Sequence, residues 1–322
     1  MVKKQFKILI VGLGNIGLKY DLGLPENCVL SHSRAFHLSE NFQIIGGVDN
    51  DKNSRDLFEK NYPYKSYSST KEALKETSPD GIIICTPPNS QFKIIKDVLK
   101  NNKIKFIVCE KPFTKSFTEA EKAVKICSEK TTAIFVNYQR NSSLVTKEII
   151  KRINQNEIRP PFKIIHLYSK GLENSCSHFI SFFNMLFGEV LETSLITNHN
   201  AEKRDKKFNH TFKLNYNLAE IIFSPLDFKY TFNGFKMYCD NGLLEYNNNG
   251  IEINWYGLKK ARNNFPRGKI IEHKKNKIES DFYYNQLSFC NELYKALIGE
   301  KGFISTGKEA LYVRKILNKL KI

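Results

Sequence analysis

Residues 9–17 leave this chain few folds to choose from. They form an apolar run that ends in three glycines with the spacing Gly12-x-Gly14-x-x-Gly17. The pattern is typical of a buried strand that turns directly into a helix, whose N-terminus can hold a dinucleotide pyrophosphate. In such a turn the first glycine permits the tight bend, the second lets the main chain approach the phosphates, and the third lets the helix pack closely on the strand. Glycine-rich turns also occur without a ligand, so this interpretation depends on the rest of the chain.

The chain up to about residue 140 alternates apolar runs with helical patterns. This alternation predicts a doubly wound parallel sheet, a Rossmann domain over residues 1–140. The expected strands are Phe6–Val11, Gln43–Val48, Gly81–Cys85, Phe106–Cys109 and Ala133–Asn137. The expected helices are Ser54–Lys60, Thr70–Glu76, Ser90–Asn101 and Phe117–Glu129. Ligands of such sheets bind beyond the carboxyl ends of the strands, where we expect Asn15 and Ile16 to lie with the three glycines.

Residues 141–322 follow a different pattern, which predicts a second, α+β domain with a mostly antiparallel, open sheet. Pro160-Pro161 marks the change of character, and residues 194–256 read as several strands separated by turns. Asp240-Asn241-Gly242 predicts a hairpin between two of those strands. Helices are expected at Thr146–Asn154, His178–Phe187, Ser280–Ile298 and Thr306–Leu320.

The formal net charge of +17 raises the question of a nucleic-acid partner. The basic residues are mostly lysines spread along the chain, and no zinc finger, helix-turn-helix or aromatic–basic platform accompanies them. We therefore expect no nucleic-acid binding. A positive field would instead help to attract an anionic small molecule such as a nucleotide-sugar.

Compartment follows from what the sequence lacks. No apolar run approaches the ~20 residues of a membrane helix, and the N-terminal residues lead straight into the first expected strand, so we expect a cytoplasmic protein with no membrane partner. The seven cysteines are odd in number and have no metal-ligand spacing. They indicate free thiols in a reducing compartment, and we expect no metal site.

Asp49 ends the second expected strand, where a carboxylate can accept hydrogen bonds from an adenosine ribose. It lies farther from Gly17 than the usual ~20 residues, and an insertion at about Tyr20–Ser33 explains the excess. The carboxylate would repel a ribose phosphate, which favours NAD over NADP. Lys52 and Arg55 nearby keep NADP open.

Two further strand ends carry distinctive residues. Thr86-Pro87-Pro88 follows the third strand, and its prolines fix the path of a rigid loop edge. Glu110-Lys111-Pro112 follows the fourth strand and would point an ammonium group into the crevice. Taken singly, the first reads equally as a strand terminator and the second as a solvated lysine.

Together these motifs resemble the Gfo/Idh/MocA oxidoreductases. The glycine fingerprint, Asp49, Thr86-Pro87-Pro88 and above all Glu110-Lys111-Pro112 appear in the order typical of that family. Residues 177–188, a histidine followed by an apolar helix that ends in Phe-Gly, are similar to a second family segment. Residues 137–140, Asn-Tyr-Gln-Arg, are similar to the segment that crosses between the family's two domains.

The resemblance implies hydride transfer between a nicotinamide and a hydroxyl-bearing carbon of a sugar or nucleotide-sugar, with a role in surface carbohydrate biosynthesis. It gives Lys111 the role of holding or deprotonating the reacting hydroxyl, and His178 the role of acid and base. Imidazole titrates near neutral pH, and an ammonium group would stabilise the developing alkoxide. The resemblance also implies that the second domain binds the substrate and forms a homo-oligomer, a dimer or tetramer, through its open sheet.

One departure from the family bears on activity. Many relatives have an aspartate four residues before the histidine, and this chain has Asn174; Ser181 is uncharged where many relatives carry an acid. An amide can orient an imidazole but stabilises imidazolium less than a carboxylate does. The alternatives are therefore an enzyme that depends more on Lys111, or a catalytically silent dinucleotide-binding sensor or scaffold. An NAD-assisted eliminating or hydrolysing enzyme is a third reading.

Secondary candidates complete the site. Tyr138 and Arg140 are expected to contact substrate together with Asn174 and His178. His32, in the inserted loop, is within reach of the cofactor cleft on this reading. His166, in an apolar strand, reads as a core histidine.

Overall fold

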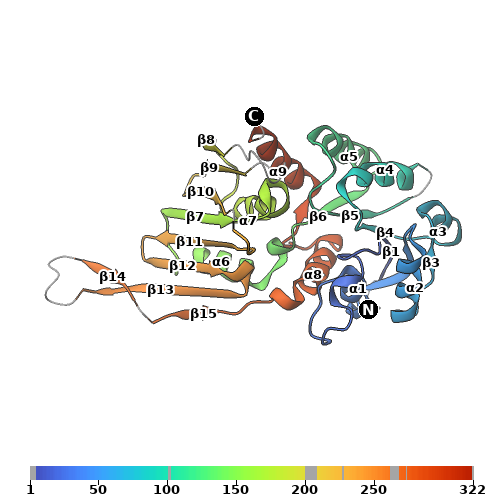
Figure 1. The fold of residues 1–322 in the computed structure, drawn as a ribbon, viewed down its shortest axis with the longest axis horizontal. Coiled ribbons are helices and arrows are strands. Elements are labelled where there is room, and N and C mark those ends of the chain that lie inside the picture. The colour runs from blue at the N-terminus through green and yellow to red at the C-terminus, as the bar shows by residue number, and fades with distance from the viewer. Residues whose placement is uncertain are drawn as a thin grey trace. The chain divides into compact units, whose positions relative to one another are not determined.

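The computed structural model describes residues 5–100, 103–199, 209–226, 228–261, 268–272 and 274–320 (Figure 1). The chain forms two compact units. Unit 1 comprises Met1–Ser142 and Tyr283–Lys315, and unit 2 comprises Ser143–Phe282 and Ile316–Ile322. The boundary at Ser142 lies close to the expected one. The segment Tyr283–Lys315, which the sequence pattern placed in the second domain, belongs to unit 1.

In its described residues, unit 1 has a seven-stranded sheet with the order β16-β6-β5-β4-β1-β2-β3. All neighbouring strands are parallel except β16, which runs antiparallel to β6. The bounds are β1 Phe6–Val11, β2 Phe42–Val48, β3 Ser66–Tyr67, β4 Gly81–Ile84, β5 Phe106–Glu110, β6 Ala133–Asn137 and β16 Ser305–Thr306. β4 and β5 are buried along their whole length, as continuous apolar strands of a parallel sheet must be when helices cover both faces.

The helices of unit 1 begin at clear capping signals. Ser31, Asp51, Ser69 and Ser116 each accept a main-chain N–H of the first helical turn. The bounds are α1 His32–Leu38, α2 Lys52–Asn61, α3 Thr70–Glu76, α4 Pro88–Leu99, α5 Phe117–Glu129, α8 Asn285–Leu297 and α9 Gly307–Lys319, with short turns at η1 Lys19–Asp21, η2 Gln139–Ser142 and η5 Phe282–Tyr284. Phe282 of η5 and the last residues of α9 fall in unit 2.

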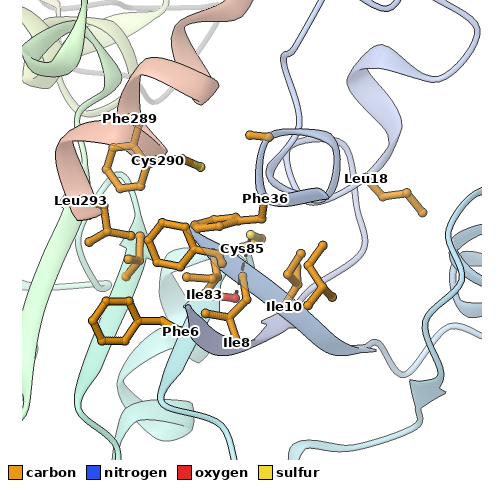
Figure 2. Close-up of a cluster of buried hydrophobic side chains, with 14 of the residues drawn as sticks. Phe6, Ile8, Ile10, Leu18, Phe36, Ile83, Cys85, Phe289, Cys290 and Leu293 are labelled. Atoms are coloured by element: carbon orange, nitrogen blue, oxygen red, sulfur yellow. Dashed lines mark hydrogen bonds between the residues drawn. The ribbon is translucent and has the colours of Figure 1, made fainter. Parts of the chain in front are cut away.

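The core of unit 1 explains why a helix from the end of the chain belongs there. α8 packs against α1, and Phe289 and Leu293 of α8 join Phe36 of α1 and Ile8 of β1 in one buried cluster (Figure 2). Phe289 is 1% exposed, and burying such a ring contributes about 1.5–3 kcal/mol. The apolar face of α8 therefore ties Tyr283–Lys315 to the parallel sheet.

Unit 2 contains a nine-stranded sheet in its described residues, ordered β14-β13-β12-β11-β7-β10-β9-β8, with β15 paired to β13. Neighbouring strands are antiparallel except β7 and β10, which are parallel. The bounds are β7 Phe162–Tyr168, β8 Glu192–His199, β9 Asn209–Asn215, β10 Ala219–Pro225, β11 Asn233–Cys239, β12 Gly242–Asn247, β13 Glu252–Lys260, β14 Lys269–Ile271 and β15 Asn276–Ile278. α6 Leu144–Asn154, the π-helical turn η3 Leu172–Cys176, α7 Ser177–Phe187 and the short turn η4 Asn248–Gly250 complete the unit. The fold class predicted from the sequence is confirmed.

Aromatic side chains make the core of unit 2. Phe179 and Phe183 of α7 lie over the sheet, with Phe183 5.2 Å from Phe235 between ring centroids. His166 is fully buried in this cluster, 4.0 Å from the Phe179 ring, and its Nδ1 lies 2.9 Å from the carbonyl oxygen of Gly234. His166 is thus a core histidine, as the sequence indicates.

All seven cysteines lie in the described part of the chain and are free thiols. Among the described helices, none is both long enough and apolar enough to cross a bilayer.

Candidate cofactor and active site

The glycine fingerprint forms a tight turn at the carboxyl end of β1. Gly12 has φ of +99°, a backbone conformation that residues other than glycine rarely adopt. Its N–H donates to the carbonyl of Val48 at 2.8 Å. A Cβ at Gly12 would lie 3.0 Å from the main-chain nitrogen of Thr86. The turn is therefore pressed against the end of β4.

The other two fingerprint glycines have opposite surroundings. A Cβ at Gly17 would lie 1.9 Å from the carbonyl oxygen of Gly12, so only glycine fits there. A Cβ at Gly14 would meet no heavy atom within 4 Å. Packing thus demands two of the glycines, whereas Gly14 faces open space beside exposed main chain. This cradle fits a dinucleotide pyrophosphate, which needs close main-chain approach.

The expectation that Gly17 leads directly into a helix is wrong. Residues 14–18 make a single helical turn, in which Leu18 donates to the carbonyl of Gly14 at 2.9 Å. The regular helix α1 begins only at His32, and it continues the turn because His32 and Ser33 donate to the carbonyls of Ile16 and Gly17, both at 2.9 Å. The insertion therefore interrupts one helix after its first turn, and α1 continues that helix after the insertion.

A buried carboxylate holds this insertion in place. Asp21 is fully buried, and one of its carboxylate oxygens accepts the main-chain N–H groups of Leu30 and Ser31 at 2.8 and 2.7 Å. Arg34 of α1 donates to the carbonyl oxygens of Pro25 and Cys28 at 3.1 and 2.9 Å. The insertion is an ordered loop closed at its base, and neither of these residues was singled out from the sequence.

Asp49 follows β2 and lies beside the fingerprint turn. Its carboxylate accepts the N–H of Leu13 at 2.7 Å and that of Asp51 at 2.9 Å. Arg55 donates to the carbonyl oxygen of Asp49 at 2.9 Å. The pKa of Asp51 is lowered, chiefly by its hydrogen bond from Ser54, with a smaller contribution from the positive charge of Lys19. The end of β2 thus combines a fixed carboxylate with nearby cations.

Thr86 and Pro87 lie at the carboxyl end of β4, directly before α4. Ser90 donates to the Thr86 hydroxyl oxygen at 2.8 Å, and Pro87 occupies the position before the first helical residue, Pro88. Gln91 of α4 donates to the carbonyl of Glu110 at 2.8 Å and accepts the N–H of Thr114 at 2.9 Å. A single amide therefore holds both sides of the Glu-Lys-Pro loop, whose Lys111–Pro112 peptide is cis.

Glu110 ends β5 as a buried carboxylate, 7% exposed. His32 Nε2 and Asn137 Nδ2 each lie 2.7 Å from the same oxygen, Oε1, and the main-chain N–H of Lys111 lies 3.3 Å from Oε2. Burial is the largest effect on the pKa of Glu110 and raises it. The hydrogen bonds from His32 and Asn137 and the charge of Lys111 outweigh it, so the pKa is lowered.

His32 lies inside unit 1. It is 1% exposed, and Nε2 faces Glu110 while its ring stacks on Phe36. Asn137 also donates to the amide oxygen of Gln286 in α8 at 3.0 Å. Gln286 and Gln91 were missed from the sequence, and Asn137 was noted only as part of residues 137–140. A polar residue in an apolar strand or helix gives no local signal of its partner.

The remaining candidates of unit 1 lie after β6. Tyr138 is 1% exposed, and Arg140 is half-buried in η2. The sheet order places the ends of β5, β4, β1 and β2 side by side, so the structure brings Glu110, Thr86, Gly12 and Asp49 to one edge of unit 1.

Unit 2 carries His178 and Asn174. His178 is 7% exposed in the first turn of α7, and Asn174 lies in the π-helical turn η3 that precedes it. Gly171, with φ of +77°, opens η3, and Gly188, with φ of +83°, ends α7 after Phe187. Lys111 and His178 belong to different units, so their meeting at one nicotinamide ring stays a prediction.

In the described ranges, no group of three or more His, Cys, Asp or Glu side chains is arranged to hold a metal ion.

Comparison with known proteins gives a family match for the first part of the chain. Residues 6–138 match the Gfo/Idh/MocA oxidoreductase family, described by its NAD-binding Rossmann fold. An uncharacterised oxidoreductase of Schizosaccharomyces pombe (strain 972 / ATCC 24843) is 32% identical over 88 residues, which are 26% of this chain and 23% of that protein. The chain thus matches about a quarter of the length of its curated relatives.

Solved structures resemble the fold over nearly the whole chain. The WlbA dehydrogenase from Bordetella pertussis, in complex with NADH and UDP-GlcNAcA, has a TM-score of 0.74 at 16% identity, covering 99% of this chain and 95% of that one. A super-repressor mutant of Gal80p from Saccharomyces cerevisiae has a TM-score of 0.77 at 13% identity, covering 98% and 95%. Residues 6–138 are thus similar to the NAD-binding Rossmann domain of the Gfo/Idh/MocA oxidoreductases.

Proposed function

We propose that this protein is an NAD(P)-dependent oxidoreductase that transfers a hydride between nicotinamide and a hydroxyl-bearing carbon of a sugar or nucleotide-sugar. One observation carries the proposal: the open cradle at Gly14 lies on the same sheet edge as the Glu110–Lys111 strand end. A dinucleotide at that edge would extend along the strand ends on which these residues lie.

Two findings support a nucleotide-sugar as the substrate class. The WlbA dehydrogenase, similar in fold, was solved with UDP-GlcNAcA. The net charge of +17 would raise the local concentration of an anionic substrate and speed its encounter with the protein. This class also agrees with a role in surface carbohydrate biosynthesis.

The proposed chemistry assigns a task to each polar group. Asp49 would accept the adenosine ribose hydroxyls, and Thr86 and Pro87 would border the cofactor. Lys111 would donate to the reacting hydroxyl oxygen and stabilise the negative charge that develops on it. His178 would accept the hydroxyl proton, and Asn174, Tyr138 and Arg140 would bind the sugar. The nicotinamide, when bound, supplies the hydride acceptor or donor.

The test separates binding from turnover. NADH and NADPH binding is measured by fluorescence quenching, followed by turnover against a panel of free sugars and UDP-sugars. Lys111→Ala is expected to lower turnover about 100-fold or more, because it removes a group used in the transition state, while NADH affinity changes less. Failure of the wild-type protein to bind either dinucleotide would rule the proposal out.

A second candidate function is a catalytically silent dinucleotide-binding sensor. Asn174 and Ser181, uncharged beside His178, favour it, and so does the similarity in fold to a Gal80p repressor variant. It requires NADH binding that survives Lys111→Ala with no turnover in either protein. Turnover that disappears on this substitution would reject it.

A further inference from the structure

Glu110 is a buried carboxylate, and buried carboxylates are uncommon where the role is structural alone. It lies inside unit 1 at the end of β5, where taking a carboxylate out of water is costly, and a buried ion is weak evidence of stabilisation. An ionised carboxylate can only accept hydrogen bonds, so His32 must carry its proton on Nε2, the atom 2.7 Å from Oε1. The ring nitrogen on the other side, Nδ1, is buried and has no hydrogen-bond partner among the described residues. Nε2 of His32 thus faces Glu110, with Asn137 Nδ2 3.4 Å away, and the ring stacks on Phe36.

Asn137 and Gln286 extend the hydrogen-bond network around Glu110. Asn137 uses its amide nitrogen on both Glu110 and Gln286, and the buried amide nitrogen of Gln286 has no hydrogen-bond partner in the described structure. His32 and Asn137, whose side chains contact the carboxylate, both belong to unit 1. The negative charge of Glu110 thus has a fixed position.

That fixed charge adjoins Lys111. The main-chain N–H of Lys111 lies 3.3 Å from Oε2 of Glu110, and Gln91 secures the loop on both sides of the Lys111–Pro112 peptide. We infer that Glu110, oriented by His32 and Asn137, is a positioning residue that fixes the main chain of Lys111 and favours its ammonium form. The inference rests on the proposed function only for the catalytic use of Lys111.

Lys111 is a cationic neighbour of Glu110. The positive charge of Lys111 contributes to the lowered pKa of Glu110, and because the interaction is mutual, the carboxylate favours a charged Lys111. The other titratable neighbours are the thiols of Cys85 and Cys109. Burial chiefly, with the charge of Glu110, raises their pKa well above the usual value, so both stay neutral.

The first experiment does not depend on turnover. The full-length protein is labelled with acetic anhydride at a series of pH values, and the acetylation of Lys111 is measured by peptide mass spectrometry. Glu110→Gln keeps the shape of the side chain and removes its charge, so the labelling midpoint of Lys111 should move about one pH unit lower. A midpoint within about 0.3 units of wild type would overturn the inference.

A second variant exchanges the carboxylate and the amide that are joined by the hydrogen bond between Glu110 and Asn137. Glu110→Gln with Asn137→Asp returns a carboxylate to the same buried site, and the amide of Gln286 can turn its nitrogen toward it. The midpoint is expected to return at least halfway to the wild-type value. A double variant that folds but labels like Glu110→Gln contradicts an electrostatic role. If neither variant yields soluble protein, Glu110 serves folding alone and the inference fails.

Thr132→Val is the matched control. It removes another buried hydrogen bond of unit 1, from Thr132 Oγ1 to the carbonyl of Ile104 at 2.7 Å, just before β6 and thus away from the carboxyl ends of the strands. Its Lys111 midpoint should equal that of wild type. A shift in this control as large as that of Glu110→Gln would show that general loosening causes the effect, and would overturn the inference.

Turnover, where the wild-type protein shows it, adds a readout that a structural role would not move. Glu110→Gln is expected to lower kcat about 10- to 100-fold with KM within about threefold, since Lys111 is misplaced for the reaction more than for binding. The double variant should recover part of kcat. A wild-type protein without turnover would remove the proposed function, while the labelling result would still decide the inference.

Discussion

A methyl group added at Gly14 and one added at Gly17 meet opposite surroundings. At Gly17 the new carbon would lie 1.9 Å from a main-chain carbonyl oxygen, whereas at Gly14 it would meet nothing within 4 Å. We expect Gly17→Ala to lower the melting temperature by roughly 10 °C or to yield no soluble protein. Gly14→Ala should keep the melting temperature within about 2 °C of wild type.

The two alanine variants separate folding from cofactor binding. Because the space beside Gly14 is where a pyrophosphate would approach, Gly14→Ala should weaken NADH binding about tenfold or more, as measured by fluorescence quenching. Each variant serves as the control of the other. NADH affinity equal to wild type in a folded Gly14→Ala protein would mean that the cradle is not the pyrophosphate site.

At the scale of the element, the end of β5 should give unit 1 an acid-sensitive contribution to stability. The pKa of Glu110 is below its usual value of 4.5, because His32, Asn137 and Lys111 together outweigh the opposing effect of burial. A carboxylate whose pKa is lower in the folded state contributes stability that is complete above the unfolded pKa and is lost as the pH falls through the folded pKa. The lost contribution therefore belongs to the range below about pH 4.5.

Thermal unfolding at two pH values tests this. The melting temperature of wild type should exceed that of Glu110→Gln at pH 7. The difference should shrink at pH 3.5, below the usual pKa of 4.5, because there the carboxyl group of the unfolded chain takes up a proton. Thr132→Val, which lacks a titratable group, should differ from wild type equally at both pH values. A Glu110→Gln difference that is the same at both pH values would contradict an ionised Glu110.

Elements with a strong local pattern were predictable from the sequence, and contacts between distant segments were not. β1, α3, α5 and β6 have the expected bounds because each is a continuous apolar run or a capped amphipathic stretch. α1 was missed because the insertion separates it from the fingerprint turn that it continues. The bond between Asn137 and Gln286 spans 149 residues, and no short-range pattern encodes it. The candidate strand-end residues were thus predictable, and the network that holds them was not.

At the scale of the whole molecule, the same limit applies to the division of the chain. A change of pattern near residue 140 indicated the end of the parallel sheet, and the first segment of unit 1 ends at Ser142. The helical pattern over α8 did not indicate against which of the two sheets the helix packs, because Phe289 and Leu293 could be buried against any apolar surface. The packing of α8 against Phe36 and Ile8 determines which unit it joins. This contact places Tyr283–Lys315 in unit 1.

The sheet of unit 2 supports a prediction about assembly, since the resemblance to the family implies pairing through this sheet. Side chains of β7 alternate, so that Ile164 and His166 are buried while Ile165 is 45% exposed, and Tyr238 of β11 is 41% exposed. An apolar residue on a two-fold interface is used twice, so one charged substitution acts on both protomers.

We therefore expect the wild-type protein to be a dimer or tetramer, and Ile165→Glu to dissociate it, because each interface would bury two unpaired carboxylates. Light scattering after size-exclusion chromatography should show a fall toward the 37.3 kDa of one chain. Leu38→Glu, at a 49% exposed apolar position of α1 in unit 1, is the matched control and should leave the mass unchanged. A wild-type mass of one chain, or an Ile165→Glu protein that keeps the wild-type mass, would show that this face is not the interface.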